Sequence, residues 1–221
     1  MSFLAKVTAF VVWRTQRGHD LLFFEHPTAG IQIPAGTVEE GESPQEAALR
    51  EVGEEAGLPV TALHVRRCLG CTERALPPDR RLILLPTRVY AHPDRTSFDW
   101  AYLRRGITVQ VNRRAKGFTQ ITYEELDRVP DPQYVTMSIT GWVPDETLAD
   151  VMRRHFFLLD FVGETAQRWT QYADRHLFRP FWAPVSALPP IIPPQDEWLA
   201  FLFQDDGDDW RPPTNDSPGH G

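Results

Sequence analysis

The sequence predicts a mixed α/β fold, and three observations lead to this prediction. Short runs rich in β-branched and aromatic residues recur along the chain, separated by Pro and Gly. Residues 44–56 carry the start and stop signals of a helix. With 42% hydrophobic and 24% charged residues in a chain of 221, the composition is that of a globular protein long enough to bury a sizeable core.

The elements before and after the helix are expected to be mostly strands. Lys6–Trp13 and Leu21–Glu25 are strand-type runs, and the turn formers of His26–Gly30 follow them. Beyond the helix, extended segments are expected at Val60–Thr72, Arg81–Tyr90, Ile107–Val111, Phe118–Tyr123 and Tyr134–Trp142.

The last third of the chain is expected to contain two strands and two helices. Leu148–Arg154 is predicted as a helix, His155–Val162 and His176–Val185 as strands, and Asp196–Phe203 as a short closing helix. Residues 205–221, rich in Pro, Gly and Asp, are predicted to form a disordered acidic tail.

The helix over residues 44–56 has unusually complete boundary signals. Ser43 is a good N-cap, Pro44 suits the first helical position, and Glu46 completes a capping box with Ser43. Gly57 can adopt the left-handed conformation that ends a helix. This element is therefore the most sharply bounded in the sequence.

The net charge of −7 is concentrated in two segments. Residues 36–58 hold seven glutamates against one arginine, a local charge of −6, and residues 205–221 hold five aspartates against one arginine, a local −4. Subtracting both from −7 leaves +3 for the rest of the chain. Carboxylates clustered within a folded segment repel one another, so side-chain cations or a bound metal ion are expected among them.

The sequence favours a reducing compartment. Its two cysteines, Cys68 and Cys71, cannot form a disulfide framework of the secreted kind, and with His64 they make at most half a zinc site, so a structural role is the preferred interpretation. No window approaches the roughly 18 apolar residues of a membrane span, and the N-terminal run lacks the pattern of a signal peptide. We expect a cytoplasmic location and no membrane partner.

Three glutamates of the helix point to metal chemistry. Glu51, Glu54 and Glu55 are spaced i, i+3 and i+4, which places their carboxylates on one helical face. Mg²⁺ takes oxygen ligands and shares its remaining positions with substrate phosphates, so this face suits it. Taken alone, the three glutamates are also compatible with a solvated acidic face.

The wider spacing is more specific. Gly36 is followed after five residues by Glu42, and after seven more by the run Arg50–Leu58, so nine defined positions over 23 residues match the Nudix box. The chain therefore resembles the Nudix hydrolases. The resemblance implies an α/β/α sandwich around a mixed β-sheet, dependence on Mg²⁺ with Mn²⁺ as a possible substitute, and hydrolysis of a nucleoside diphosphate linked to another group X.

The resemblance also implies a division of the chain. Residues 1–74 would form the first part of the Nudix domain, with the box at 36–58, and residues 151–204 its second part. Residues 75–150 exceed what a compact family member needs and would be a largely β insertion.

By motif position, Glu51, Glu54 and Glu55 become the expected metal ligands, with the Ala35 carbonyl as an additional one. Arg50 is expected to hold a glutamate of the box in place, and Glu54 and Glu51 are the first candidates for the general base. Structural positions are expected at Gly36, Glu42 and Gly57, and family members also recruit a base from outside the box, for which Glu164, Asp174 and His176 are eligible.

Two other functions remain open at this stage. A Nudix-fold module could bind or regulate through a nucleotide without cleaving it, although such a module has no need of three clustered glutamates. An RNA-associated pyrophosphohydrolase is suggested only by the basic residues of the acid-free stretch Trp100–Tyr123, which more simply form a solvated face. The partner expected is a nucleotide-type small molecule rather than nucleic acid, and the sequence is compatible with a homodimer. Nucleotide sugars, ADP-ribose and nucleoside triphosphates are all candidate substrates.

Overall fold

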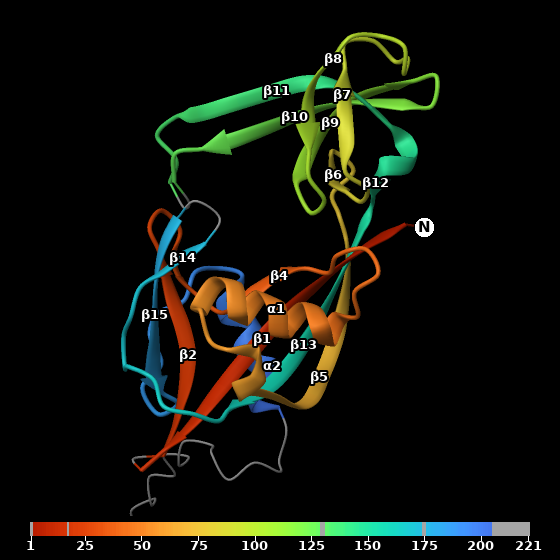
Figure 1. Cartoon of the computed structure of the whole chain (residues 1–221). Helices are drawn as coiled ribbons and strands as arrows, with labels where there is room; N and C mark the ends of the chain where they lie inside the picture. The colour runs from red at the N-terminus through yellow and green to blue at the C-terminus, as the bar shows by residue number, and fades with distance from the viewer. Residues whose placement is uncertain (1, 17, 129–130, 174–175, 205–221) are drawn as a thin grey trace, which may run out of the picture.

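The structure, a computed structural model, describes residues 2–16, 18–128, 131–173 and 176–204, and these form two β-sheets (Figure 1). The main sheet has eight strands, in the order β14-β15-β2-β1-β13-β5, with β3 paired to β2 and β4 paired to β1. Its strands are β1 (Phe3–Thr15), β2 (Gly18–His26), β3 (Gly30–Gln32), β4 (Ala35–Thr37), β5 (Leu63–Ala75), β13 (Val151–Phe161), β14 (Gln171–Ala173) and β15 (His176–Pro184).

The second sheet has seven strands in the order β12-β6-β9-β10-β11-β7-β8, all paired antiparallel. Its strands are β6 (Arg80–Ile83), β7 (Thr87–Tyr90), β8 (Asp99–Leu103), β9 (Thr108–Ala115), β10 (Phe118–Leu126), β11 (Val135–Pro144) and β12 (Leu148–Ala149). The two α-helices of the described ranges are α1 (Pro44–Ala56) and α2 (Gln195–Phe203), and short 3₁₀ turns lie at Val60–Ala62 and Asp145–Thr147. Neither α-helix has the length and apolar character needed to cross a membrane.

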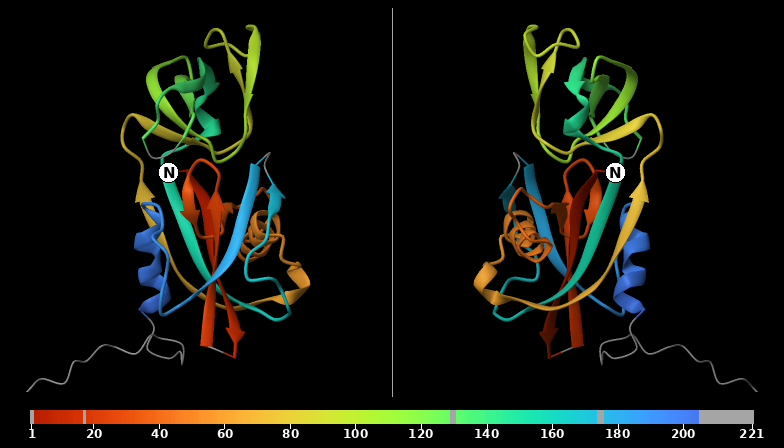
Figure 2. Two further views of the ribbon diagram at one scale, coloured as in Figure 1. Left: turned by 90° about the vertical axis from the view of Figure 1, so that its left-hand side faces the viewer. Right: turned by 90° about the vertical axis from the view of Figure 1, so that its right-hand side faces the viewer.

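The main sheet is mixed and is covered on both faces. Its central strands β1 and β13 run parallel, with Phe3 opposite Val151 and Trp13 opposite Phe161. Residues 7–12 of β1 are all buried, as expected for a strand with a layer on each side. Helix α1 covers one face and α2 the other, so the predicted α/β/α sandwich is confirmed (Figure 2).

Helix α1 begins and ends at the residues that its signals predict. The Ser43 side chain accepts a hydrogen bond from the Glu46 backbone, and the Glu46 carboxylate accepts one from the Ser43 backbone at 2.8 Å. Gly57 takes the left-handed conformation, with φ 68°. Ala48 and Val52 are buried against the sheet, whereas Glu54 is exposed and Glu51 and Glu55 are partly buried.

The second sheet is connected to the main sheet through two neighbouring strands, β5 and β13. The chain leaves β5 at Ala75 and returns to β13 at Val151, and these two residues are opposite each other in the ladder. The N–H of Leu76 also donates to the carbonyl of Asp150 at 2.9 Å. A separate apolar cluster fills the second sheet: Ile83, Val89, Leu103, Val109, Ile121, Ile139, Val143 and Leu148.

One predicted element is wrong. Leu148–Arg154, expected to be helical, forms β12 and the beginning of β13. From Val151 onward this segment is held between β1 and β5, and such pairing with two strands outweighs a local helical pattern. The expected strand Arg81–Tyr90 is interrupted at Pro86, and the sequence did not indicate the short strands β3, β4, β8 and β14.

Residues 205–221, predicted to be a disordered tail, lie outside the described part of the chain.

Candidate active site

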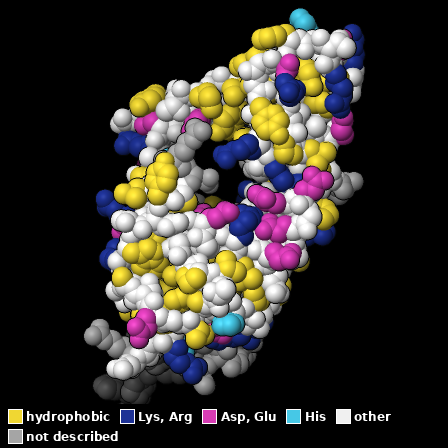
Figure 3. Space-filling view, in the orientation of Figure 1, with side chains coloured by type: hydrophobic (Ala, Val, Ile, Leu, Met, Phe, Trp, Pro, Cys, Tyr) yellow, Lys and Arg dark blue, Asp and Glu magenta, His cyan; other side chains and the backbone are white. Residues whose placement is uncertain are grey.

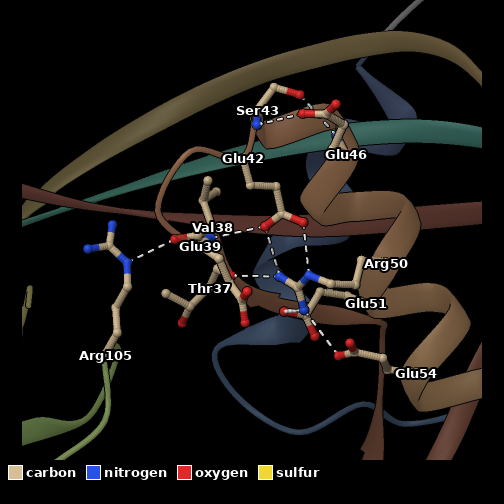
Figure 4. A network of polar contacts seen from close by, with 10 residues as sticks. All are labelled: Thr37, Val38, Glu39, Glu42, Ser43, Glu46, Arg50, Glu51, Glu54 and Arg105. Atoms are coloured by element: carbon tan, nitrogen blue, oxygen red, sulfur yellow. Dashed lines mark hydrogen bonds and ion pairs between the residues drawn. The ribbon is translucent and has the colours of Figure 1, made fainter. Parts of the chain in front are cut away.

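Arg50 is the centre of the polar network at α1 (Figure 4). Its Nε and Nη2 donate to the two carboxylate oxygens of Glu42 at 2.8 and 3.0 Å, and Nη2 also donates to the Thr37 carbonyl at 3.0 Å. Its Nη1 donates to Glu51 and to Glu54, both at 3.0 Å. One guanidinium therefore offsets the repulsion among three carboxylates.

These contacts shift the pKa values of both partners. Hydrogen bonds from Arg50 hold the pKa of Glu42 below its usual range, and the same bonds raise the pKa of Arg50. Glu42 also accepts a hydrogen bond from the Glu39 backbone at 3.0 Å, which fixes the loop before the helix. Glu42 thus connects that loop to Arg50, in keeping with the structural position expected for it.

Glu51 is the most enclosed glutamate of this network, with 12% of its side chain exposed against 55% for Glu54. Burial raises the pKa of Glu51, an effect that the charge of Arg50 partly opposes. The carboxylate lies directly on Gly36, where a Cβ would stand 1.8 Å from Glu51 Oε1. Glycine is required at position 36 because Glu51 occupies the space of any side chain there.

Glu55 connects the helix to strand β4. Its Oε2 accepts a hydrogen bond of 3.0 Å from the backbone N–H of Ala35. The structure therefore brings Ala35 and Gly36 of β4 next to the glutamates of α1, although the loop after β4 and the first half of the helix lie between them in the chain.

A cavity of about 440 Å³ opens along this face of the helix. One wall consists of Glu51, Glu54 and Glu55 with Gly53, and the other is strand β14, with Gln171, Tyr172 and Ala173. The sequence did not indicate the β14 residues as part of the site. No local pattern in residues 171–173 indicates that they contact helix α1, which lies more than 110 residues earlier in the chain.

The C-terminus of α1 is fixed by residues in and just before β14. Gln171 Nε2 donates to the Glu54 carbonyl at 3.1 Å, and Trp169 Nε1 donates to the Ala56 carbonyl at 2.6 Å. These bonds satisfy carbonyls that a helix C-terminus leaves without a partner. Gly57 meets two demands here, since its φ is positive and a Cβ would lie 2.5 Å from Gln171 Oε1.

The three candidate bases outside the box are placed differently. His176, the first residue of β15, stacks on His26 with ring centroids 4.9 Å apart, and it does not line the carboxylate cavity. Burial and the neighbouring His176 lower the pKa of His26. Glu164 is exposed in the loop after β13 and is not part of the cavity wall either. Asp174 lies outside the described residues.

The residue types at this face fit a hard divalent cation, while their present arrangement is held by Arg50. Carboxylate and carbonyl oxygens are the ligands that such a cation prefers. Among the described residues, however, no three acidic, histidine or cysteine side chains converge in a geometry that could hold a metal ion. An ion at this face would share or compete with Arg50 for the oxygens of Glu51 and Glu54.

Comparison with known proteins agrees with this geometry. A family model of the NUDIX domain matches residues 4–100, a range that contains α1 and the whole glutamate network. The chain is also similar to the crystal structure of a protein assigned to the NUDIX hydrolases from Listeria monocytogenes strain 4b F2365. The two are 14% identical, with coverage of 84% of this chain and 79% of the other and a TM-score of 0.32. No curated protein sequence matches. Residues 4–100 are therefore similar to the NUDIX domain, and α1 with its glutamates lies within the matched range.

Proposed function

We propose that this protein is a Mg²⁺-dependent hydrolase that cleaves the pyrophosphate bond of a nucleoside diphosphate linked to another group X. The observation that carries the proposal is the row of three glutamates on α1 facing a cavity of about 440 Å³. Mn²⁺ is expected to substitute for Mg²⁺, because both accept oxygen ligands. The substrate is a nucleotide-type small molecule, and a cytoplasmic location and a homodimer are proposed with it.

The proposed metal ligands are the carboxylates of Glu51, Glu54 and Glu55 and the carbonyl of Ala35. When bound, the ion neutralises charge on the phosphate oxygens during phosphoryl-bond hydrolysis. Glu51 is fixed by Arg50 and by the N–H of Thr37, which suits a ligand whose position must not vary.

Glu54 is the proposed general base. It is the most exposed glutamate bonded to Arg50, and it lines the cavity, so its carboxylate can reach a water molecule there. Glu51 is the second candidate. Glu164 and His176 line no part of this cavity, which favours a base from α1 over either of them.

We infer that residues 75–150 are an insertion in the NUDIX domain, which resumes at residue 151. The pairing of Ala75 with Val151 supports this division, because β5 and β13 would form an ordinary antiparallel pair without the intervening chain. The separate apolar cluster of the second sheet supports it as well.

A binding module without hydrolytic activity is the second candidate. The observation in its favour is that Nη1 of Arg50 donates to both Glu51 and Glu54, so the fold itself supplies a counter-charge to these carboxylates. The RNA-associated alternative gains no such support. Arg105 donates to the carbonyls of Val38 and Leu84, and Arg113 donates to Gln120, so two of its basic residues already have partners within the fold.

The test is a screen of ADP-ribose, nucleotide sugars and nucleoside triphosphates with identification of the products. We expect cleavage between the two phosphates, its loss on adding EDTA, and its recovery with excess Mg²⁺. Tight nucleotide binding without phosphate-containing products from any compound would identify the binding module instead.

A further inference from the structure

A cleft separates the main sheet from the second sheet. Figure 3 shows the molecule hollowed between its two parts, with basic side chains above the hollow and acidic ones below it. Two cavities of about 620 and 520 Å³ make up this cleft, and both are lined by Tyr102, Arg104 and Ile107 of the second sheet. Each volume is in the range of small-molecule sites.

The cleft adjoins the carboxylate network through Thr37. The backbone of this residue contacts both Arg50 and Glu51, and the same residue lines the larger cavity together with Glu39 and Glu40. At the other end, His176 lines the smaller cavity, at the start of the strand that pairs with β14. A substrate whose diphosphate lies at α1 can therefore extend into the cleft.

The turn after β8 contacts the segment Thr37–Val38 of the Nudix-box loop. The Arg105 guanidinium donates to the Val38 carbonyl and to the Leu84 carbonyl, which ties the loop before α1 to the second sheet. Gly106 has a φ of 88°, and a Cβ there would stand 2.5 Å from Thr37 Oγ1. Both features fix the position of Arg104 and Tyr102 relative to the carboxylates.

Arg104 and Tyr102 line the cleft, and both side chains are exposed. Within the described part of the chain, the exposed Arg104 forms no hydrogen bond or ion pair, unlike its neighbour Arg105. Tyr102 leaves 62% of its surface exposed, a large value for an aromatic residue in a strand. An exposed ring beside an uncommitted guanidinium is a surface on which a planar group can stack.

We propose that this cleft binds the nucleoside of the substrate, with the base stacked on Tyr102 beside Arg104, and that these two residues determine substrate specificity. The proposal rests on the proposed function, because it assumes that the diphosphate lies at α1. The opposite wall carries the carboxylates of Glu39 and Glu40, which can accept hydrogen bonds from ribose hydroxyls. The same carboxylates would repel a phosphate group, so a nucleoside fits this cleft better than a second anion does.

The test measures binding rather than turnover. Calorimetry in the presence of Mg²⁺ compares two ligands, inorganic pyrophosphate and whichever of the α,β-methylene analogues of ADP and UDP binds the parent protein more tightly. The variants are Tyr102→Ala and Arg104→Gln. The matched controls are Phe98→Ala and Arg114→Gln. Phe98 is an exposed aromatic residue immediately before β8, Arg114 is an exposed arginine of β9, and neither lines a cavity of the cleft.

We expect both cleft variants to bind the nucleotide analogue about tenfold more weakly than the parent, the size of effect that loss of base stacking produces. The affinity of these variants for pyrophosphate, and both affinities of the control variants, should stay at the parental level. Unchanged affinity of the cleft variants for the analogue would overturn the proposal. Equal losses for analogue and pyrophosphate, or a parent that binds neither analogue, would also overturn it. If the expected pattern holds but no compound is hydrolysed, the cleft assignment stands and the hydrolase assignment fails.

Discussion

Glu51 is a largely buried carboxyl group, and its ionisation makes the free energy of unfolding depend on pH. Because burial raises its pKa, the folded state binds the proton of this carboxyl more tightly than the unfolded state does. The associated stabilisation is complete below the usual pKa of 4.5 and is lost as the pH rises through the folded value. At neutral pH without metal, the ionised Glu51 therefore lowers the free energy of unfolding.

We predict that Glu51→Gln raises the free energy of unfolding at pH 7 in EDTA and that this gain shrinks as the pH falls towards 4.5. Urea unfolding at several pH values measures it, with Glu124→Gln, an exposed glutamate on β10, as the control. A gain that stayed constant over the whole range would show that ionisation of Glu51 is not its source.

Glu54 should matter for turnover far more than for folding. With its side chain 55% exposed, Glu54→Gln should leave the unfolding midpoint nearly unchanged. Loss of a base and metal ligand should lower kcat by on the order of 10²-fold or more. Steady-state kinetics at saturating Mg²⁺ test this, and Glu164→Gln is the matched control expected to keep parental kcat. Parental turnover by Glu54→Gln would refute the assignment.

Gly36 provides a test of how closely the Glu51 carboxylate must be placed. A Cβ at this position would overlap Glu51 Oε1, so Gly36→Ala must displace the carboxylate. We predict an increase of about tenfold or more in the Mg²⁺ concentration needed for half-maximal activity, the usual scale when ligand positioning is lost. The Mg²⁺ titration is compared with that of Gly117→Ala, a turn glycine of the second sheet with open space around it and a φ of 76°, which adds backbone strain without moving Glu51. Identical titrations of parent and Gly36→Ala would contradict the prediction.

At the scale of elements, helix α1 holds its glutamates in place because both of its ends are fixed. Ser43 and Glu46 close the first turn reciprocally, and the side chains of Trp169 and Gln171 bind carbonyls near the last. The N-terminal bonds are local, whereas the C-terminal ones come from a distant segment. The loop that follows β13 therefore stabilises the helix whose face it helps to enclose.

Ser43→Ala should lower the free energy of unfolding by about 1 kcal/mol, the typical cost of losing an N-cap side chain. Urea denaturation measures the change, and Ser138→Ala, an exposed serine in β11, is the control expected to have almost no effect. A loss no greater than that of the control would mean that the capping box does not contribute to the stability of α1.

At the scale of the whole molecule, the second sheet is joined to the main sheet by a pair of chain crossings and a few additional contacts. Leu4 packs on Leu82 and Ala149, and Arg105 reaches Val38. The core between β1, β13 and the two helices contains no residue of the second sheet. We therefore expect the main sheet and its two helices to fold as an independent unit.

We predict that replacing residues 76–150 by Asn-Gly leaves a protein that unfolds cooperatively, because Ala75 and Val151 already face each other and this dipeptide forms a tight hairpin turn. The unfolding midpoint should fall, since Leu4 loses its cover. Circular dichroism during thermal unfolding tests this; a non-cooperative transition would show that the main sheet depends on the second sheet. Mg²⁺-dependent hydrolysis should persist with a higher KM, because the chemistry is at α1 and the cleft is lost.

Local sequence is sufficient to specify helix α1, its caps and the spacing of its glutamates. These depend on residues within a few positions of one another, so spacing alone specifies them. The sandwich and its family followed from the spacing of the same motif. The long buried run of β1 could be read as a strand, but its partner strand could not.

Which distant segments meet is apparent from the tertiary structure alone. It made Leu148–Arg154 extended by pairing its first residues with β6 and its last residues with β1 and β5, and it brought Gln171 to the carbonyl of Glu54. It also gave two adjacent arginines of the cleft different roles, since Arg105 donates to backbone carbonyls and Arg104 does not. Such outcomes depend on pairing and packing between residues far apart in the chain, and no local pattern encodes them.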